Sequence, residues 1–210
     1  MEETTEKINL DKKQNYKLAS HNTMSYLTPK KWYFRLIAFT ARCQSKNIFE
    51  QYEKYGARLF DLRFKFDKKG NVNFAHGAVV YKSNMDFIKE VLSFLNEKEV
   101  PVRVVYENKA GEFEQEFYDL CKWIEETYPK AKWFAGRNKW TWKRIYEFKT
   151  PDANMEDKYS SYNVNVPGKK QTGTIIDDLW PWIYAKLNNR KNRLAGTEKE
   201  YLMIDFVEIN

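Results

Sequence analysis

Two histidines are the only ones in the chain, and each stands in a short segment that mixes polar and apolar residues. His21 lies in "LASHNT" and His76 lies in "NFAHG". Imidazole changes its charge near neutral pH, so one histidine can act as a general base and the other as a general acid. The first question is therefore whether His21 and His76 belong to one site.

Charged residues also interrupt or follow apolar segments that are typical of strands. Asp61 and Arg63 lie in "ARLFDLRFKF", Glu107 ends "VRVVYE", and Asp205 lies in "YLMIDFV". An apolar strand tolerates a charge only where it is paired or reaches a solvated pocket. A guanidinium matches a phosphate, and a carboxylate behind a histidine fixes the tautomer of its ring. Two histidines and an arginine are thus a set of groups suited to cleaving a phosphodiester without a metal.

Each of these residues also has a purely structural interpretation. A single histidine is often a hydrogen-bonded structural group, and Asp61 with Arg63 could form a same-face salt bridge. Glu107 could be a solvated strand end, and Asp205 could cap a loop. The functional hypothesis therefore depends on whether the fold brings the set together.

The first half of the chain shows alternating strand and helix patterns. The segment "SKNIFEQYEKYG", residues 45–56, predicts a short helix that ends at Gly56, and residues 57–66 predict a strand with period-two alternation. "DKKGN" predicts a turn, and residues 72–80 return as a second strand. The segment "MDFIKEVLSFLNEKE" predicts an amphipathic helix whose apolar stripe comprises Met85, Ile88, Val91, Leu92 and Leu95.

The second half continues the alternation less regularly. We expect a strand in "VRVVYEN", a helix in "GEFEQEFYDLCKWIEETYP" and a shorter helix around "KWTWKRIYEF". Residues 150–174 are loop-like, "IIDDLWPWIYAKLNNRK" predicts a helix interrupted or started by Pro181, and "EYLMIDFVEI" predicts a closing strand. Helical segments between strands favour an α/β fold of parallel β/α units, and a barrel would place its site at the strands' C-terminal ends.

Composition restricts the class of protein and its partners. The chain has 210 residues, 42% of them hydrophobic, and a net charge of +7. Its dispersed lysines suit either a solvated face or attraction to an anionic surface, and they do not form a nucleic-acid motif. Cys43 and Cys121 show no CxxC spacing, so they predict neither a zinc site nor a disulfide framework. With no signal or membrane-spanning segment in the sequence, we expect a soluble chain. Its location stays open, because a secreted form could have lost a signal.

Taken in order, these motifs resemble the X-domain of phosphatidylinositol-specific phospholipase C. "LASHNT" and "FAHG" resemble its two histidine motifs, and "IFEQYEKYGARLFDLRF" is the longest and most specific match. "VRVVYEN" and "YLMIDFV" resemble two later strands. The resemblance covers residues 16–109 well and the last ten residues moderately, whereas residues 110–200 carry no recognisable motif. It implies a single catalytic domain over residues 1–210 with a distorted or reduced TIM-type (β/α) barrel.

The resemblance also implies roles for individual residues. His21 would take the proton of the inositol 2-hydroxyl, and His76 would protonate the leaving oxygen, giving an inositol cyclic phosphate and diacylglycerol. Asp205 would orient His21, Arg63 would neutralise the phosphate, and Asp61 would hold Arg63 or a substrate hydroxyl. These five are the expected catalytic residues. Asn22, Glu107 and Lys109 are the expected substrate-binding residues.

The expected enzyme is a phosphoric diester hydrolase or phosphorus–oxygen lyase of the bacterial-like, metal-independent type. A calcium ion held by Asn22, Asp61 and Glu107 is the alternative, but a guanidinium at Arg63 would repel it. Asn22 stands where the bacterial type has an aspartate that is paired with the second histidine. An asparagine carries no charge, so the sequence leaves open which group adjusts the proton affinity of His76.

We expect a phosphoinositide or another anionic phosphodiester as substrate and a peripheral membrane surface as a partner. The resemblance also implies an aromatic substrate contact from the later part of the chain, where a helical aromatic is more often part of the core. The candidates are Trp133, Trp140, Trp142, Tyr159, Tyr162 and Trp180. Two other functions remain open. One is a catalytically weak barrel that binds anionic lipid or phosphosugar headgroups. The other is the same chemistry on a phosphodiester without inositol.

Overall fold

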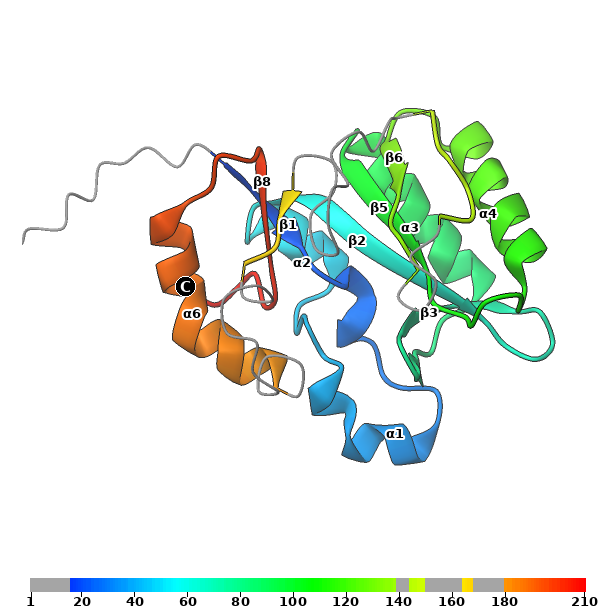
Figure 1. Ribbon diagram of the computed structural model, residues 1–210, viewed down its shortest axis with the longest axis horizontal. Coiled ribbons are helices and arrows are strands. Elements are labelled where there is room, and N and C mark those ends of the chain that lie inside the picture. The colour runs from blue at the N-terminus through cyan, green and yellow to red at the C-terminus, as the bar shows by residue number, and fades with distance from the viewer. Residues whose placement is uncertain (1–15, 139–143, 150–163, 168–179) are drawn as a thin grey trace, which may run out of the picture.

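The computed structural model describes residues 16–138, 144–149, 164–167 and 180–210 (Figure 1). Its strands are β1 (Lys17–Ser20), β2 (Ala57–Phe66), β3 (Val72–His76), β4 (Val79–Val80), β5 (Pro101–Tyr106), β6 (Lys132–Ala135), β7 (Val164–Asn165) and β8 (Tyr201–Ile204). Its helices are α1 (Trp32–Leu36), α2 (Ile48–Glu53), α3 (Met85–Glu97), α4 (Glu114–Thr127) and α6 (Pro181–Ala195), with short 3₁₀ helices η1 (Thr23–Tyr26) and η2 (Ala38–Thr40).

A run of parallel strands in the order β6–β5–β2–β1–β8–β7 forms the scaffold. No pairing joins β6 to β7 among the described residues, so the barrel is not closed by hydrogen bonds there. Phe134 of β6 and Val164 of β7 nevertheless belong to one buried cluster with Ala19, Leu59 and Met203. The two ends of the sheet therefore face a common interior. The predicted α/β fold, a distorted TIM-type barrel, is confirmed.

Strand β2 shows how the sequence pattern determines the two faces of this sheet. Phe60, Leu62 and Phe64 are fully buried in the outer core, and Ile88 and Val91 of α3 belong to the same cluster. The residues between them, including Asp61 and Arg63, point to the other face, as the alternation predicts. The expected strand over residues 57–66 is confirmed at both ends.

Helix α3 corrects one detail of the predicted apolar stripe. Ile88, Val91, Leu92 and Leu95 are buried as expected, but Met85 is 40% exposed. The physical reason is its position in the first turn, directly after Asn84, whose side-chain oxygen accepts a hydrogen bond from the Phe87 N–H. The turn that carries the cap faces solvent.

A hairpin departs from the regular β/α order and is central to the site. Strand β2 continues beyond β1, turns over residues 67–71 and pairs with β3 in antiparallel register. Gly70 in this turn has a φ of 78°, which suits glycine. Strand β3 thus runs back toward the barrel and ends at His76.

The later half agrees less completely with the sequence patterns. The expected short helix around "KWTWKRIYEF" is wrong in its described part, because residues 144–149 are not helical. Residues 139–143 lie outside the described residues. Strand β7 lies within the expected loop over residues 150–174. Most of that loop is also outside the residues that the structure describes. Helix α6 begins at Pro181, where a missing N–H costs nothing, in agreement with one of the two predicted alternatives.

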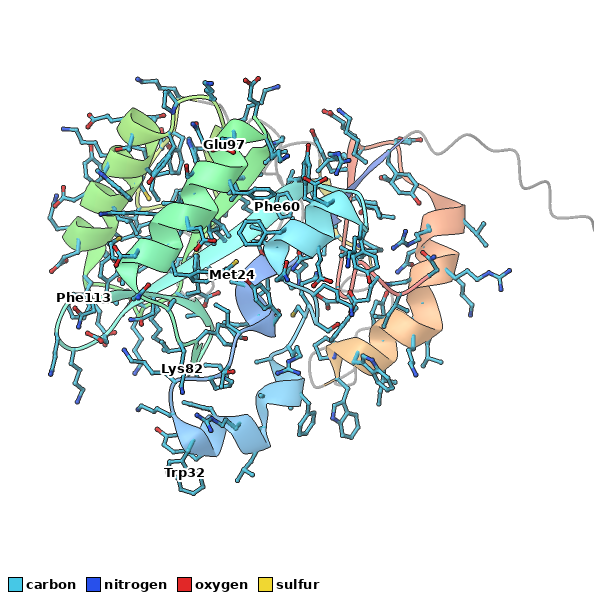
Figure 2. All side chains as sticks on the ribbon, turned by 180° about the vertical axis from the view of Figure 1, so that it is seen from behind. Met24, Trp32, Phe60, Lys82, Glu97 and Phe113 are labelled. Atoms are coloured by element: carbon cyan, nitrogen blue, oxygen red, sulfur yellow. The ribbon has the colours of Figure 1, made fainter. Side chains whose placement is uncertain are left out.

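Helix α1 projects from the body of the molecule below the sheet (Figure 1), and Trp32 lies on its outer side (Figure 2). Among the helices that the structure describes, none combines the length and apolar character needed to cross a bilayer.

Candidate active site

The charged and histidine residues come together at the C-terminal ends of the parallel strands. His21 follows β1, Asp205 follows β8 and Glu107 follows β5, while Arg63 lies within β2. The β3 hairpin adds His76 from the opposite direction. The sequence-predicted convergence of these segments on one mouth of the barrel is therefore seen in the structure.

His21 lies between an acid and a guanidinium. Its Nδ1 is 2.6 Å from Asp205 Oδ1, and its Nε2 is 2.7 Å from Nη2 of Arg63. A carboxylate accepts and a guanidinium only donates, so Nδ1 carries the hydrogen and Nε2 presents a lone pair. These two partners define a neutral ring in a single tautomer, which is the form that a general base requires.

Arg63 is held by two buried carboxylates. Its Nε donates to Asp61 Oδ2 at 2.9 Å, and its Nη1 donates to Glu107 Oε1 at 3.0 Å. Burial alone would lower the pKa of Arg63, but Asp61 and Glu107 outweigh it and raise that pKa above the usual value. The guanidinium is thus a permanent positive charge held in a defined plane.

Asp61 is fully buried below Arg63. Burial raises the pKa of its carboxyl, but Arg63, Arg103 and the Asn22 N–H together outweigh burial, and the pKa lies well below its usual range. Asp61 is therefore ionised in the folded protein.

Arg103 is a residue of this network that the motif analysis missed. It pairs in register with Asp61 across β2 and β5, and its Nη1 lies 3.6 Å from Asp61 Oδ1. A signal was available, because Arg103 and Glu107 are four residues apart and so fall on the same face of an apolar strand. Arg103 extends the charge network toward the barrel interior.

His76 faces His21 across the mouth of the barrel. The two ring centroids are 6.3 Å apart with the planes at 85°. His76 Nδ1 donates to the Ala41 carbonyl at 2.9 Å, which also accepts the Tyr81 hydroxyl at 3.2 Å. Because Glu107 Oε2 accepts the Gly77 N–H at 3.2 Å, the acid that holds Arg63 also anchors the turn after His76.

Asn22 and Cys43 lie next to each other beside the two histidines. Asn22 has a left-handed backbone with φ of 44°, and its N–H donates to Asp61 Oδ2 at 3.0 Å. Its amide nitrogen lies 3.9 Å from Cys43 Sγ, which is itself 4.0 Å from His76 Nδ1. No sequence signal identified Cys43, because it lies in an irregular segment.

Buried amides position the strand ends. Gln44 donates from one side-chain nitrogen to the carbonyls of His21 and Ile204, both at 3.1 Å, and thereby joins the ends of β1 and β8. Asn189 of α6 donates to the Asp205 carbonyl at 2.8 Å. The His21–Asp205 pair is therefore supported from two further elements.

The residues proposed for calcium do not fit that ion. Calcium requires six to eight oxygen ligands. Here Arg63 lies between the carboxylates of Asp61 and Glu107 and donates to both, while the Asn22 amide nitrogen is directed at Cys43. The guanidinium group of Arg63 thus occupies the space between the two carboxylates that a calcium ion would need.

Two of the expected substrate contacts, Lys109 and Trp133, lie away from this network. Lys109 is on the exposed loop after β5, where its carbonyl accepts the Tyr106 hydroxyl at 3.1 Å. Trp133, one of the aromatic residues considered for substrate, is buried in the outer core. Four others, Trp140, Trp142, Tyr159 and Tyr162, lie outside the described residues.

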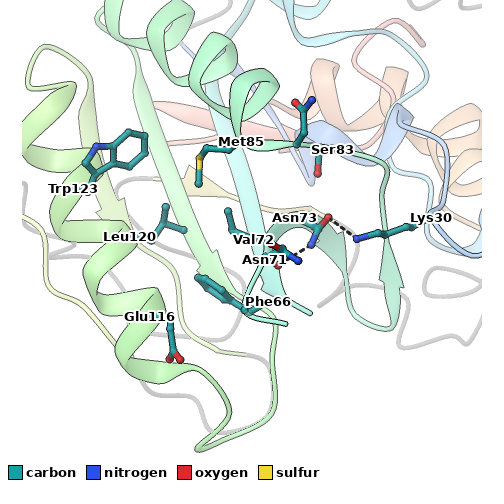
Figure 3. Close-up of a pocket in the computed structure, with 12 residues that line it drawn as sticks. Lys30, Phe66, Asn71, Val72, Asn73, Ser83, Met85, Glu116, Leu120 and Trp123 are labelled. Atoms are coloured by element: carbon teal, nitrogen blue, oxygen red, sulfur yellow. Dashed lines mark hydrogen bonds between the residues drawn. The ribbon is translucent and has the colours of Figure 1, made fainter. Parts of the chain in front are cut away.

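A separate cavity of about 560 Å³ lies on the outer side of the β2–β3 hairpin (Figure 3). Its lining includes Phe66, Val72, Leu120 and Trp123, with Lys30 at one edge. None of the histidines or carboxylates of the network lines it. The cavity is therefore distinct from the candidate active site.

Comparisons with known proteins agree with the fold. No protein-family model and no curated protein matches the chain. A phosphatidylinositol-specific phospholipase C from Staphylococcus aureus with incorporated pentafluoro-phenylalanine has 15% identity and a TM-score of 0.51, over 91% of this chain and 85% of that one. A second S. aureus structure, from work on membrane binding of that phospholipase, has 15% identity and a TM-score of 0.50, over 94% and 89%. The enzyme from Listeria monocytogenes has 15% identity and a TM-score of 0.49, over 92% and 91%. The chain thus shares the fold of the two S. aureus structures along most of its length.

Proposed function

We propose that residues 1–210 form one catalytic domain that cleaves phosphatidylinositol-type phosphodiesters by metal-independent acid–base catalysis. The observation that carries this proposal is the placement of His21 and His76 with ring centroids 6.3 Å apart, with Arg63 bound to the first. This arrangement suits a phosphate flanked by an attacking and a leaving oxygen. The fold shared with S. aureus phosphatidylinositol-specific phospholipase C supports the same class of reaction.

His21 is the proposed general base. Its Nε2 lone pair takes the proton of the inositol 2-hydroxyl, whose oxygen attacks the adjacent phosphorus and closes a cyclic phosphate. The imidazolium formed in this step is stabilised by Asp205, which lies 2.6 Å from the other ring nitrogen.

His76 is the proposed general acid. The role requires the imidazolium form, in which Nδ1–H stays with the Ala41 carbonyl and Nε2–H is the proton given to the leaving glycerol oxygen. The bond between phosphorus and that oxygen breaks, and diacylglycerol leaves with the proton. A backbone carbonyl and a neighbouring thiol, rather than a carboxylate at residue 22, surround Nδ1.

Arg63 is proposed to bind the phosphate. Its Nη2 contacts His21 in the structure, and we expect it to turn this donor to a phosphate oxygen when substrate enters. Asp61 and Glu107 keep the guanidinium plane in position through Nε and Nη1. Glu107 thereby acts as a positioning residue, while contacts of Asn22 and Lys109 with substrate remain predictions.

The proposed partner is an anionic membrane surface. Trp32 and Leu36 of α1 are each 71% exposed, and Phe39 of η2 and Trp182 of α6 are about half exposed. Lys31 and Arg35 are exposed on the same segment. Because this apolar and basic segment continues directly to Ala41, which contacts His76, membrane contact would bring the lipid phosphate to the site.

The test is cleavage of phosphatidylinositol vesicles in the presence of EDTA. The wild-type protein is expected to release an inositol cyclic phosphate, and His21→Ala is expected to lose at least about 10²-fold in rate, the size of a general-base contribution. Phosphatidylcholine vesicles are the substrate control, and circular dichroism checks the fold of the variant. Equal rates for both proteins would refute the assignment.

Two other outcomes identify the alternatives. Vesicle binding that survives His21→Ala, with no turnover by either protein, would indicate a binding barrel. Turnover of a glycerol-linked or glycan-linked phosphodiester, without turnover of the inositol lipid, would assign the same chemistry to another substrate.

A further inference from the structure

Cys43 lies within the candidate active site but has no part in the proposed reaction. Its side chain is 1% exposed, and its Sγ is 4.0 Å from His76 Nδ1. The backbone around it is held firmly: the Ser25 hydroxyl oxygen accepts the Cys43 N–H at 2.9 Å, and the Cys43 carbonyl accepts the Phe206 N–H at 2.6 Å. The thiol is therefore fixed beside the residue that follows Asp205.

Three side chains with different metal-binding atoms meet at this point. A ring nitrogen of His21, the sulfur of Cys43 and a carboxylate oxygen of Asp205 all lie within 4.8 Å of one another. Ligands of tetrahedral zinc are about 3.5 Å apart, as follows from zinc–ligand distances of about 2.0–2.3 Å. Side-chain rotations that move these three atoms by about an ångström would give the spacing of three zinc ligands, and water would take the fourth position.

One carboxylate of the network contacts the His21 ring directly. Asp61 and Glu107 are paired with guanidinium groups, whereas Asp205 Oδ1 lies 2.6 Å from His21 Nδ1 and can offer its oxygen to an ion at this point. A thiolate at Cys43 would add one more negative charge. The donor set of nitrogen, sulfur and one oxygen suits zinc or cobalt, whereas calcium and magnesium require oxygen ligands.

We propose that His21, Cys43 and Asp205 form an inhibitory site for a thiolate-binding divalent metal ion such as Zn²⁺. The consequence for catalysis rests on the proposed function of His21, but the binding itself does not. The ion takes the place of the hydrogen between His21 Nδ1 and Asp205, and that hydrogen moves to Nε2. The Cys43 thiol releases its proton to solvent. With Nε2 protonated, His21 has no lone pair for the substrate hydroxyl, and Arg63 must leave its contact with the ring.

Cobalt titration tests the binding independently of any activity. Co²⁺ bound to a thiolate gives a charge-transfer absorption in the near ultraviolet, which Zn²⁺ should displace. Cys121 is the only other cysteine and is buried in the outer core, so Cys121→Ala is the matched control. We expect the band in the wild type and in Cys121→Ala, and its loss in Cys43→Ser. Apparent affinity in Cys43→Ser should fall at least about tenfold, because even changes beyond the direct ligands cost about 10- to 100-fold.

Zinc sensitivity tests the consequence. Phosphodiester cleavage by the wild type and Cys121→Ala should fall with Zn²⁺ and recover with EDTA, while the ratio of rates with and without Zn²⁺ should stay near one in Cys43→Ser. A band that persists in Cys43→Ser, or its absence from the wild type, overturns the proposed site. If the wild type cleaves no phosphodiester, the proposed function fails and the cobalt titration still decides the metal site.

Discussion

Arg63 Nη2 lies 2.7 Å from Nε2 of His21, so the phosphate-binding candidate and the candidate base are in direct contact before substrate enters. Because a guanidinium only donates, the Nε2 lone pair of His21 accepts a hydrogen bond from Arg63 Nη2. The lone pair is therefore directed at the group that is proposed to bind the phosphate. A substrate phosphate that takes over this Arg63 donor would release the lone pair for the adjacent hydroxyl. In the proposed reaction, substrate binding and activation of the base would therefore be coupled through one guanidinium nitrogen.

Arg63→Lys tests whether the planar fork is required. A lysine ammonium cannot reach Asp61, Glu107 and His21 at once, although it keeps the charge. With loss of one or two charge-assisted hydrogen bonds, each contributing about 1.5–3 kcal/mol, we expect kcat/KM to fall by about 10²-fold. The control is Arg58→Lys on the same strand, where Arg58 contacts the Tyr52 ring and backbone carbonyls outside the site. Similar rates for both lysine variants would contradict the role of Arg63.

Asp205→Asn tests the tautomer of His21. An amide can donate to Nδ1 and so favour the ring with its hydrogen on Nε2, which removes the base. We expect kcat to fall between about 10²- and 10⁴-fold, while the melting temperature changes little because Asn189 binds the backbone carbonyl of residue 205. Steady-state kinetics and thermal unfolding measure the two effects. Asp119→Asn on the surface of α4 is the control, and an unchanged kcat in Asp205→Asn would exclude this role.

Asp61→Asn is expected to reduce stability in a pH-dependent way. The pKa of Asp61 is lowered in the folded protein, so its contribution is full above the unfolded value of about 3.9 and is lost as pH falls below it. Near neutral pH the variant leaves Arg63 and Arg103 without their shared carboxylate, which should cost about 3–5 kcal/mol in the free energy of unfolding.

Urea unfolding of wild type and Asp61→Asn at neutral pH and at about pH 3 measures this difference. The stability gap between the two proteins should narrow at the lower pH. A gap that stays constant or widens would show that Asp61 is not held ionised by the two arginines.

The exposed apolar segment predicts binding to anionic vesicles. Each buried Trp or Leu side chain contributes about 1.5–3 kcal/mol when fully removed from water, so Trp32→Ala with Leu36→Ala should weaken partitioning by at least about tenfold. Leu194→Ala near the end of α6, at a residue that is 52% exposed, is the control. Vesicle sedimentation measures the partitioning, and an equal loss in the control would refute this surface.

The alternation in residues 57–66 predicted both faces of β2, because a strand with period two has only two ways to place its side chains. The positions of His21, His76 and Asp205 followed from their places at strand ends. Cys43 and Gln44 could not be predicted, since they reach the site from an irregular segment whose path depends on Ser25 and on contacts with residues near the C-terminus. Arg103 carried a period-two signal that the motif comparison did not use.

The assignment of His21 as general base and His76 as general acid is tested most directly by changing the leaving group of the substrate. Rates of His21→Ala and His76→Ala are compared on phosphatidylinositol and on an inositol phosphodiester with a nitrophenolate leaving group, which departs without a proton. We predict that His76→Ala recovers most of its lost rate on the nitrophenyl substrate, whereas His21→Ala stays at least about 10²-fold below wild type on both. Recovery of both variants, or of His21→Ala alone, would contradict His21 as base and His76 as acid.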